Sequence, residues 1–136
     1  MRFRLSAAFL LALIGALSIS CGGIVDPSKN SVEGPFTGTL PPNGFFAYKF
    51  SASTTGEIQV KLITLTPAAV PVIGVQWVQA SSDGNCNGSL LQNNTFATAN
   101  STVISGRIPS GTYCIVVYDS IGQSVTANYS LTISHP

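Results

Sequence analysis

One pattern governs the chain from Pro35 onward: short runs of alternating apolar and polar residues, separated by Gly, Pro, Asn and Ser. Phe46, Tyr48 and Phe50, for example, alternate with small or charged residues. A period of two is typical of half-buried β-strands, and this region has no helical apolar period. The sequence therefore predicts an all-β fold.

Seven runs are expected to form strands, and they cover residues 36–40, 46–51, 58–62, 72–79, 103–108, 112–119 and 128–134. The region 86–100 is harder to assign, because four asparagines interrupt its apolar residues. Seven or eight short antiparallel strands within about 100 residues predict a single β-sandwich or barrel. A chain of 136 residues has room for one such domain.

The first twenty residues form a separate block. Arg2 and Arg4 precede an uncharged apolar stretch, residues 5–19, which is shorter than the roughly 20 residues of a membrane-spanning helix. A basic start, a short apolar stretch and a small-residue exit are typical of a cleaved export signal, expected here as a helix within residues 1–20. The alternative is an N-terminal membrane anchor that stays attached.

Beyond this leader the chain is nearly neutral. Residues 21–136 hold four Lys or Arg side chains and five Asp or Glu side chains, a net charge of −1 with the single histidine neutral. Proteins bind a phosphate backbone through clustered cations, which this region lacks. Nucleic acid and strongly acidic substrates are therefore not expected as partners.

Residues 17–22, Leu-Ser-Ile-Ser-Cys-Gly, resemble a lipobox, the signal that directs diacylglycerol to a cysteine. The resemblance implies that Cys21 becomes the lipidated N-terminus, and that Gly22 directs the protein to the outer membrane of a two-membrane bacterium. Stable attachment takes two or more acyl chains, which a lipoprotein cysteine carries. The alternative is ordinary signal-peptidase cleavage near Ser20, which leaves Cys21 as an incidental thiol.

With Cys21 assigned to lipid, Cys86 and Cys114 remain as an even pair. In an exported domain such a pair predicts a structural disulfide. It would close a loop of about 28 residues, worth roughly 3–4 kcal/mol on the chain-entropy model. Zinc is not expected, because two thiols and His135 do not complete a tetrahedral site.

Two parts of the chain resemble the bacterial pre-peptidase C-terminal domain, over roughly residues 35–135. The opening matches are Gly-Thr-Leu at 38–40, Phe-Ala-Tyr-Lys-Phe-Ser at 46–51 and Ile-Gln-Val at 58–60; the closing ones are residues 110–119 and Tyr-Ser-Leu-Thr-Ile at 129–133. The resemblance implies a jelly-roll-like β-sandwich in an exported protein. Some relatives bind collagen or polysaccharide and some carry calcium, but residues 72–77 lack the acidic side chains that a calcium site would need.

No set of residues forms a convincing catalytic site, so the chain is not expected to be an enzyme, and no cofactor or metal is expected. A catalytic triad needs a rigidly held base, whereas His135 is the penultimate residue, where fraying is expected. Asp83 and Asp119 fall in turns, where aspartates usually bond to the backbone.

Two aromatic residues are candidates for stacking on a ligand such as a sugar. Tyr113 and Tyr129 fall on the core side of their strands by alternation, whereas Tyr118 falls on the face opposite Tyr113. Trp77 lies late in its strand, next to a loop. Trp77 and Tyr118 are therefore expected to be exposed.

The sequence thus predicts three segments: a signal peptide (1–20), a flexible tether from the lipidated Cys21 (21–34) and a β-domain (35–136). The leading hypothesis is a non-enzymatic binding or adhesion module in the cell envelope, with a polysaccharide or an envelope protein as its partner. The alternatives are a purely structural envelope module and a hydrolase that uses Asp83 and Asp119.

Overall fold

The computed structural model describes residues 29–136, and over these residues the chain forms eight strands and no α-helix. The strands are β1 (Ser31–Leu40), β2 (Phe45–Ala52), β3 (Gly56–Thr66), β4 (Ile73–Gln79), β5 (Leu90–Ala97), β6 (Ser101–Ile108), β7 (Gly111–Tyr118) and β8 (Ala127–His135). The predicted all-β fold is confirmed. The predicted signal peptide, Cys21 and the first part of the predicted tether lie outside the described residues.

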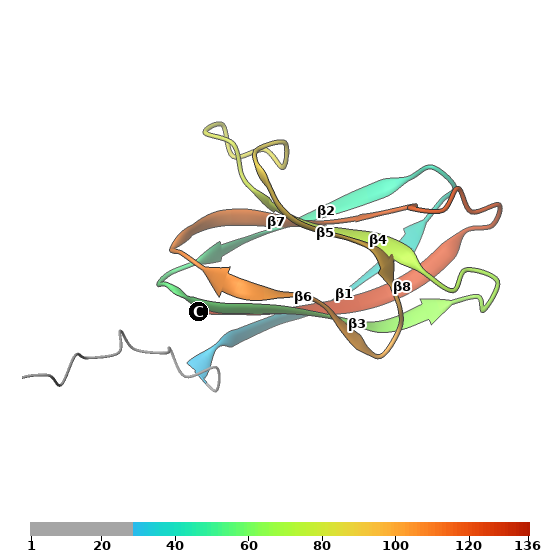
Figure 1. Cartoon of the computed structure of the whole chain (residues 1–136), viewed down its shortest axis with the longest axis horizontal. Helices are drawn as coiled ribbons and strands as arrows, with labels where there is room; N and C mark the ends of the chain where they lie inside the picture. The colour runs from blue at the N-terminus through green and yellow to red at the C-terminus, as the bar shows by residue number, and fades with distance from the viewer. Residues whose placement is uncertain (1–28) are drawn as a thin grey trace, which may run out of the picture.

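The strands form two four-stranded antiparallel sheets (Figure 1). One sheet has the order β1-β8-β3-β6 and the other has the order β2-β7-β4-β5. Only the connection from β4 to β5 joins two strands of the same sheet; every other connection crosses between the sheets. Apolar side chains from both sheets belong to one buried cluster, so the two sheets share a single core.

Strand β8 shows how the sequence places that core. Tyr129, Leu131 and Ile133 are buried, and the residues between them are half-buried. Successive side chains of a strand point to opposite faces. The period of two that predicted this strand therefore also identifies its inner face.

Strand β1 begins earlier than the sequence predicted. Ser31 pairs with His135 and Glu33 pairs with Ile133, so residues 31–34 belong to the sheet and not to a flexible tether. The register of this pairing shifts between Glu33 and Phe36. The polar composition of residues 31–34 fits an edge strand, because β1 has a neighbour on one side only.

Strand β5 lies in the region that the sequence left unassigned. It is also an edge strand, and most of its side chains are exposed, so it needs few apolar residues. Asn94 instead donates a hydrogen bond from Nδ2 to the carbonyl of Val103 in β6 at 3.0 Å. Of the four asparagines that obscured the strand, Asn93 and Asn94 lie within β5, and Asn87 and Asn100 lie outside it.

The connections gather at two ends of the molecule. The N-terminal end comprises residues 29–30, 53–55, 80–89, 109–110 and 136, and the distal end comprises residues 41–44, 67–72, 98–100 and 119–126. Figure 1 shows the start of β1 close to the C-terminus. The chain therefore enters and leaves the domain at the same end.

The predicted disulfide between Cys86 and Cys114 is present, with a Cα–Cα distance of 5.6 Å. It joins the β4–β5 loop to the outward-facing side of β7. Cys114 and its neighbour in the sheet, Val78, are both buried, although the alternation places them on the outer face. The β4–β5 loop thus covers the sheet where it is bonded to Cys114.

Candidate functional site

Trp77 does not lie on the surface, so the prediction that it stacks on a ligand is wrong. Its side chain is 6% exposed, and its ring packs against Tyr113 with the centroids 5.8 Å apart. Along β4 it follows Ile73 and Val75 at intervals of two, and both of those are buried. Alternation within the strand, and not closeness to a loop, decides which face a side chain occupies.

Tyr118 lies on the outer face of the β2-β7-β4-β5 sheet, as its alternation predicted, but its side chain is half-buried and not exposed as expected. It pairs with Gly74 of β4, and a Cβ atom added to Gly74 would lie 2.2 Å from the Tyr118 ring. The Tyr118 hydroxyl donates a hydrogen bond to Oδ1 of Asn93 in β5 at 2.8 Å. The ring therefore lies over the backbone of β4 and points toward β5.

Two exposed phenylalanines share this face and this end of the sheet with Tyr118. Phe45 pairs with Tyr118 and is 70% exposed, and Phe96 of β5 is 72% exposed. The pairing of β4 with β5 shifts register opposite Gly74, between the pairs Ile73–Ala97 and Val75–Asn94. Phe96 lies in this shift, next to the buried Ala97, and its side chain points outward. We term Phe45, Tyr118 and Phe96 the aromatic row. The row runs across the sheet at its distal end and has one ring on each of β2, β7 and β5. On β4 the corresponding residue is Gly74, which has no side chain.

Sequence analysis missed both phenylalanines, although one signal was available. Phe45 and Phe46 are adjacent, and adjacent residues of a strand point to opposite faces. Since Phe46 was assigned to the inner face with Tyr48, Phe45 had to point outward. Phe96 carried no comparable signal, because its strand was not recognised.

The next outward positions, one step toward the N-terminal end, form a second row that carries no charge. In order across the sheet they are Ala47, Val116, Gln76 and Asn93. The first charged group beyond them on β2 is Lys49, whose Nζ contacts the carbonyl of Gly84 at 3.5 Å. The face thus combines exposed aromatic rings with amide side chains.

Asp119 joins the two loops beside the aromatic row. Its carboxylate accepts hydrogen bonds from the backbone N–H groups of Asn43, Ile121 and Gln123 at 2.9–3.1 Å. Desolvation raises the pKa of Asp119, but these backbone hydrogen bonds outweigh it and leave the pKa below its ordinary value. Asp119 is therefore bonded to the backbone, as its position in a turn predicted.

We expect Asp119→Asn to destabilise the protein by about 1–2 kcal/mol at neutral pH, because these N–H groups lose a charged acceptor. A carboxylate with a lowered folded pKa contributes stability that is present above its unfolded pKa of about 3.9 and lost as the pH falls through the folded pKa. The difference between wild type and variant should therefore shrink in acid. Urea denaturation across this pH range measures it, with Glu57→Gln as a control; a difference that does not depend on pH would contradict the prediction.

Asp83 lies at the opposite end of the molecule, in the β4–β5 loop. A hydrogen bond from the Ser81 hydroxyl, followed by bonds from the backbone and side chain of Asn85, lowers the pKa of Asp83. Since Asp83 is at the N-terminal end and Asp119 at the distal end, the two carboxylates do not form the pair that the hydrolase hypothesis required.

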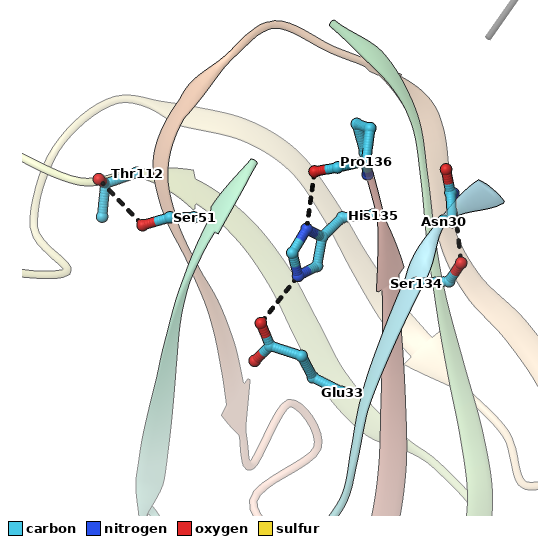
Figure 2. Close-up of polar contacts among 7 residues, drawn as sticks. All are labelled: Asn30, Glu33, Ser51, Thr112, Ser134, His135 and Pro136. Carbon is cyan, nitrogen blue, oxygen red and sulfur yellow. Dashed lines mark hydrogen bonds and ion pairs between the residues drawn. The ribbon is translucent and has the colours of Figure 1, made fainter. Parts of the chain in front are cut away.

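His135 is buried, and several contacts fix it in place, which corrects the expectation of a frayed end. Its Nε2 lies 2.9 Å from Oε1 of Glu33, and its Nδ1 lies 3.2 Å from the backbone oxygen of Pro136 (Figure 2). The ring also packs against Phe50, with the centroids 4.9 Å apart. These contacts tie the start of β1 to the end of β8.

No hydroxyl nucleophile contacts this imidazole among the described residues. Figure 2 also draws the hydroxyls of Ser51 and Thr112, which lie 3.4 Å from each other on neighbouring strands. Neither forms a hydrogen bond with the ring of His135. The polar partners of its ring among the described residues are Glu33 and Pro136.

The outer face of the other sheet differs from the face that carries the aromatic row. It has a shallow polar hollow at its distal end, lined by Thr37, Gly38, Thr39, Thr64, Thr66, Asn128, Tyr129 and Ser130. The side chain of Tyr129 points instead to the core, where burial together with a hydrogen bond to Tyr48 raises its pKa well above the ordinary value. Exposed aromatic rings are thus confined to one of these two distal surfaces.

In the part of the chain that the structure describes, no three His, Cys, Asp or Glu side chains are grouped closely enough to hold a metal ion. No helix in the same part is long and apolar enough to cross a membrane. The sequence matches no family model, and no curated protein matches it either.

Proposed function

We propose that the chain is an exported lipoprotein whose β-domain is a non-enzymatic binding module, with the aromatic row as its binding surface. The observation that carries the proposal is the exposure of Phe45 and Phe96 beside Tyr118 on one face. Moving a large aromatic side chain out of water and into an interface lowers the free energy of the system. Several of them on one open face are typical of a surface that a partner covers.

The domain is further proposed to be a jelly-roll-like β-sandwich related to the pre-peptidase C-terminal domain. The strand orders β1-β8-β3-β6 and β2-β7-β4-β5 support this arrangement, because connections that cross between two sheets are typical of double Greek-key folds. The single core shared by both sheets also supports it. Such a sandwich leaves the outer faces of both sheets open to a partner, except where the β4–β5 loop covers Cys114 and Val78.

Lipid on Cys21 would set the orientation of the domain, with outer-membrane placement implied by Gly22. The nine residues 22–30 separate Cys21 from β1 and span at most about 30 Å. Since β1 begins at the N-terminal end, this end would face the bilayer. The aromatic row is at the distal end, so it would point away from the membrane.

The proposed anchor is tested by metabolic labelling with a fatty-acid probe in a two-membrane bacterium. We expect the wild-type protein to incorporate the probe and to fractionate with membranes, and Cys21→Ala to lose both properties. Cys86→Ala is the matched control, because it removes a cysteine that carries no lipid in this proposal. An unlabelled wild-type protein, or a labelled Cys21→Ala variant, would refute the anchor.

The binding function is tested by co-sedimentation of the detergent-solubilised full chain with envelope material from cells that lack it. We expect the wild type to sediment and the double variant Phe45→Ala/Phe96→Ala to stay in solution. Leu91→Ala is the control, since Leu91 is an exposed apolar residue at the other end of β5. Equal sedimentation of all three proteins, or of none, would favour a purely structural module.

A further inference from the structure

The ring of Tyr118 is held flat by two positioning residues. Gly74 lies directly beneath it, and any side chain there would overlap the ring, at 2.2 Å for the nearest atom. Asn93 accepts the hydrogen bond from its hydroxyl at 2.8 Å. The middle ring of the aromatic row is thus pre-formed as a flat surface, and a ligand would not have to order it.

The dimensions of the aromatic row favour an extended ligand. Phe45 lies on β2 and Phe96 on β5, with β7 and β4 between them. Neighbouring strands are about 4.8 Å apart, so the row spans about 14 Å from its first strand to its last. A ligand that covers the row must therefore present apolar faces at several points along its length.

The surroundings of the row favour an uncharged ligand with polar edges. Neither the aromatic row nor the second row carries a charge, so nothing there would neutralise an ionic ligand. Gln76 and Asn93 supply amides beside the rings, where they can bond to hydroxyl groups. A chain of pyranose rings matches this arrangement, because each ring has a flat C–H face and a rim of hydroxyls.

Two other kinds of partner fit the row less well. A protein interface usually has a continuous apolar centre, whereas the amide side chains of Gln76 and Asn93 lie in the positions next to the row. The lipid of the anchoring membrane is excluded by position, because the short segment before β1 leaves the domain from the opposite end.

We infer that the aromatic row binds an uncharged polysaccharide chain that lies across the strands. Its sugar rings stack on Phe45, Tyr118 and Phe96, and its hydroxyls bond to Gln76 and Asn93. The inference rests on the proposed binding function and names the chemical class of its ligand.

Isothermal titration of the detergent-solubilised full chain with cellohexaose and chitohexaose tests the inference, with oligogalacturonate as the anionic comparison. We expect the wild type to bind an uncharged hexasaccharide and not the anionic one. Phe45→Ala and Phe96→Ala should each weaken this binding about tenfold. Phe46→Ala is the matched control, since it removes the neighbouring phenylalanine on the opposite face of β2.

Gly74→Ala tests the positioning of Tyr118 without removing any aromatic ring. The added methyl must displace the ring from its place over β4, so we expect binding to weaken about tenfold. Gly106→Ala in β6 is the matched control, because a Cβ there would make only an ordinary contact with Trp77 at 3.5 Å. Thermal melts of both variants confirm that they are folded. Unchanged binding by folded Gly74→Ala would overturn the role of the flat ring.

The outcomes separate this inference from the proposed function. If neither uncharged hexasaccharide binds, or if the anionic one binds as well, the ligand class is wrong. If row-dependent sedimentation with envelope material persists in that case, the binding function stands. If the Phe45→Ala/Phe96→Ala variant also sediments with envelope material as the wild type does, both proposals fail.

Discussion

Replacing Cys86 and Cys114 together with alanine is expected to lower the free energy of unfolding by about 3–4 kcal/mol. The disulfide joins residues 28 apart, and cutting it restores the conformational entropy of that loop to the unfolded chain. The loss is large against the roughly 5–15 kcal/mol of net stability of a typical domain. It also frees the β4–β5 loop from β7, which exposes the side chain of Val78.

Urea denaturation, monitored by the fluorescence of Trp77, measures this loss. The wild-type protein treated with a thiol reductant should lose about as much stability as the double variant. The same reductant should have no effect on the double variant, which has no disulfide to reduce. Equal stability of the oxidised wild type and the double variant would show that the crosslink contributes nothing.

Trp77→Ala is expected to lower the free energy of unfolding by about 3–5 kcal/mol, because it removes the largest side chain of the buried cluster and leaves a cavity between the sheets. The ring contacts Tyr113 and lies close to Gly106 of the facing sheet, so few neighbours can move in to fill the space. Urea denaturation monitored by circular dichroism measures the effect, since this variant has no tryptophan.

Trp77→Phe distinguishes a role in packing from a role in binding. The Nε1 of Trp77 is buried and has no hydrogen-bond partner among the described residues. A phenyl ring therefore keeps most of the packing and breaks no hydrogen bond, and we expect a loss below about 2 kcal/mol. Binding of the hexasaccharides should be unchanged. A folded Trp77→Phe protein that has lost sugar binding would show that the residue contacts the ligand.

Much of the fold was predictable because β-strand alternation is a local property of the sequence. Phe50, Ile115 and Leu131 all face the core at the positions that a period of two assigned to them. The same rule placed Tyr118 outward, and it would have placed Trp77 inward had it been applied there. The error at Trp77 came from giving more weight to a nearby loop than to the strand pattern.

Two segments at sheet edges, the start of β1 and strand β5, were predicted less well. Residues 31–33 and β5 have few apolar residues, because an edge strand with exposed side chains buries little surface. Their place in the sheets comes from backbone pairing with β8 and β4, which any sequence without proline at those positions can supply. Composition therefore gave no sign of them.

By itself, the sequence determined the all-β class, most strand positions, the Cys86–Cys114 pairing and the outward side of Tyr118, since each of these follows from local pattern or from cysteine count. Only the tertiary structure decided that Phe45, Gly74 and Phe96 lie beside Tyr118. These four residues, Tyr118 included, belong to four different strands, and which strands become neighbours depends on how the whole core packs. The same holds for His135, whose contact with Glu33 joins opposite ends of the described chain.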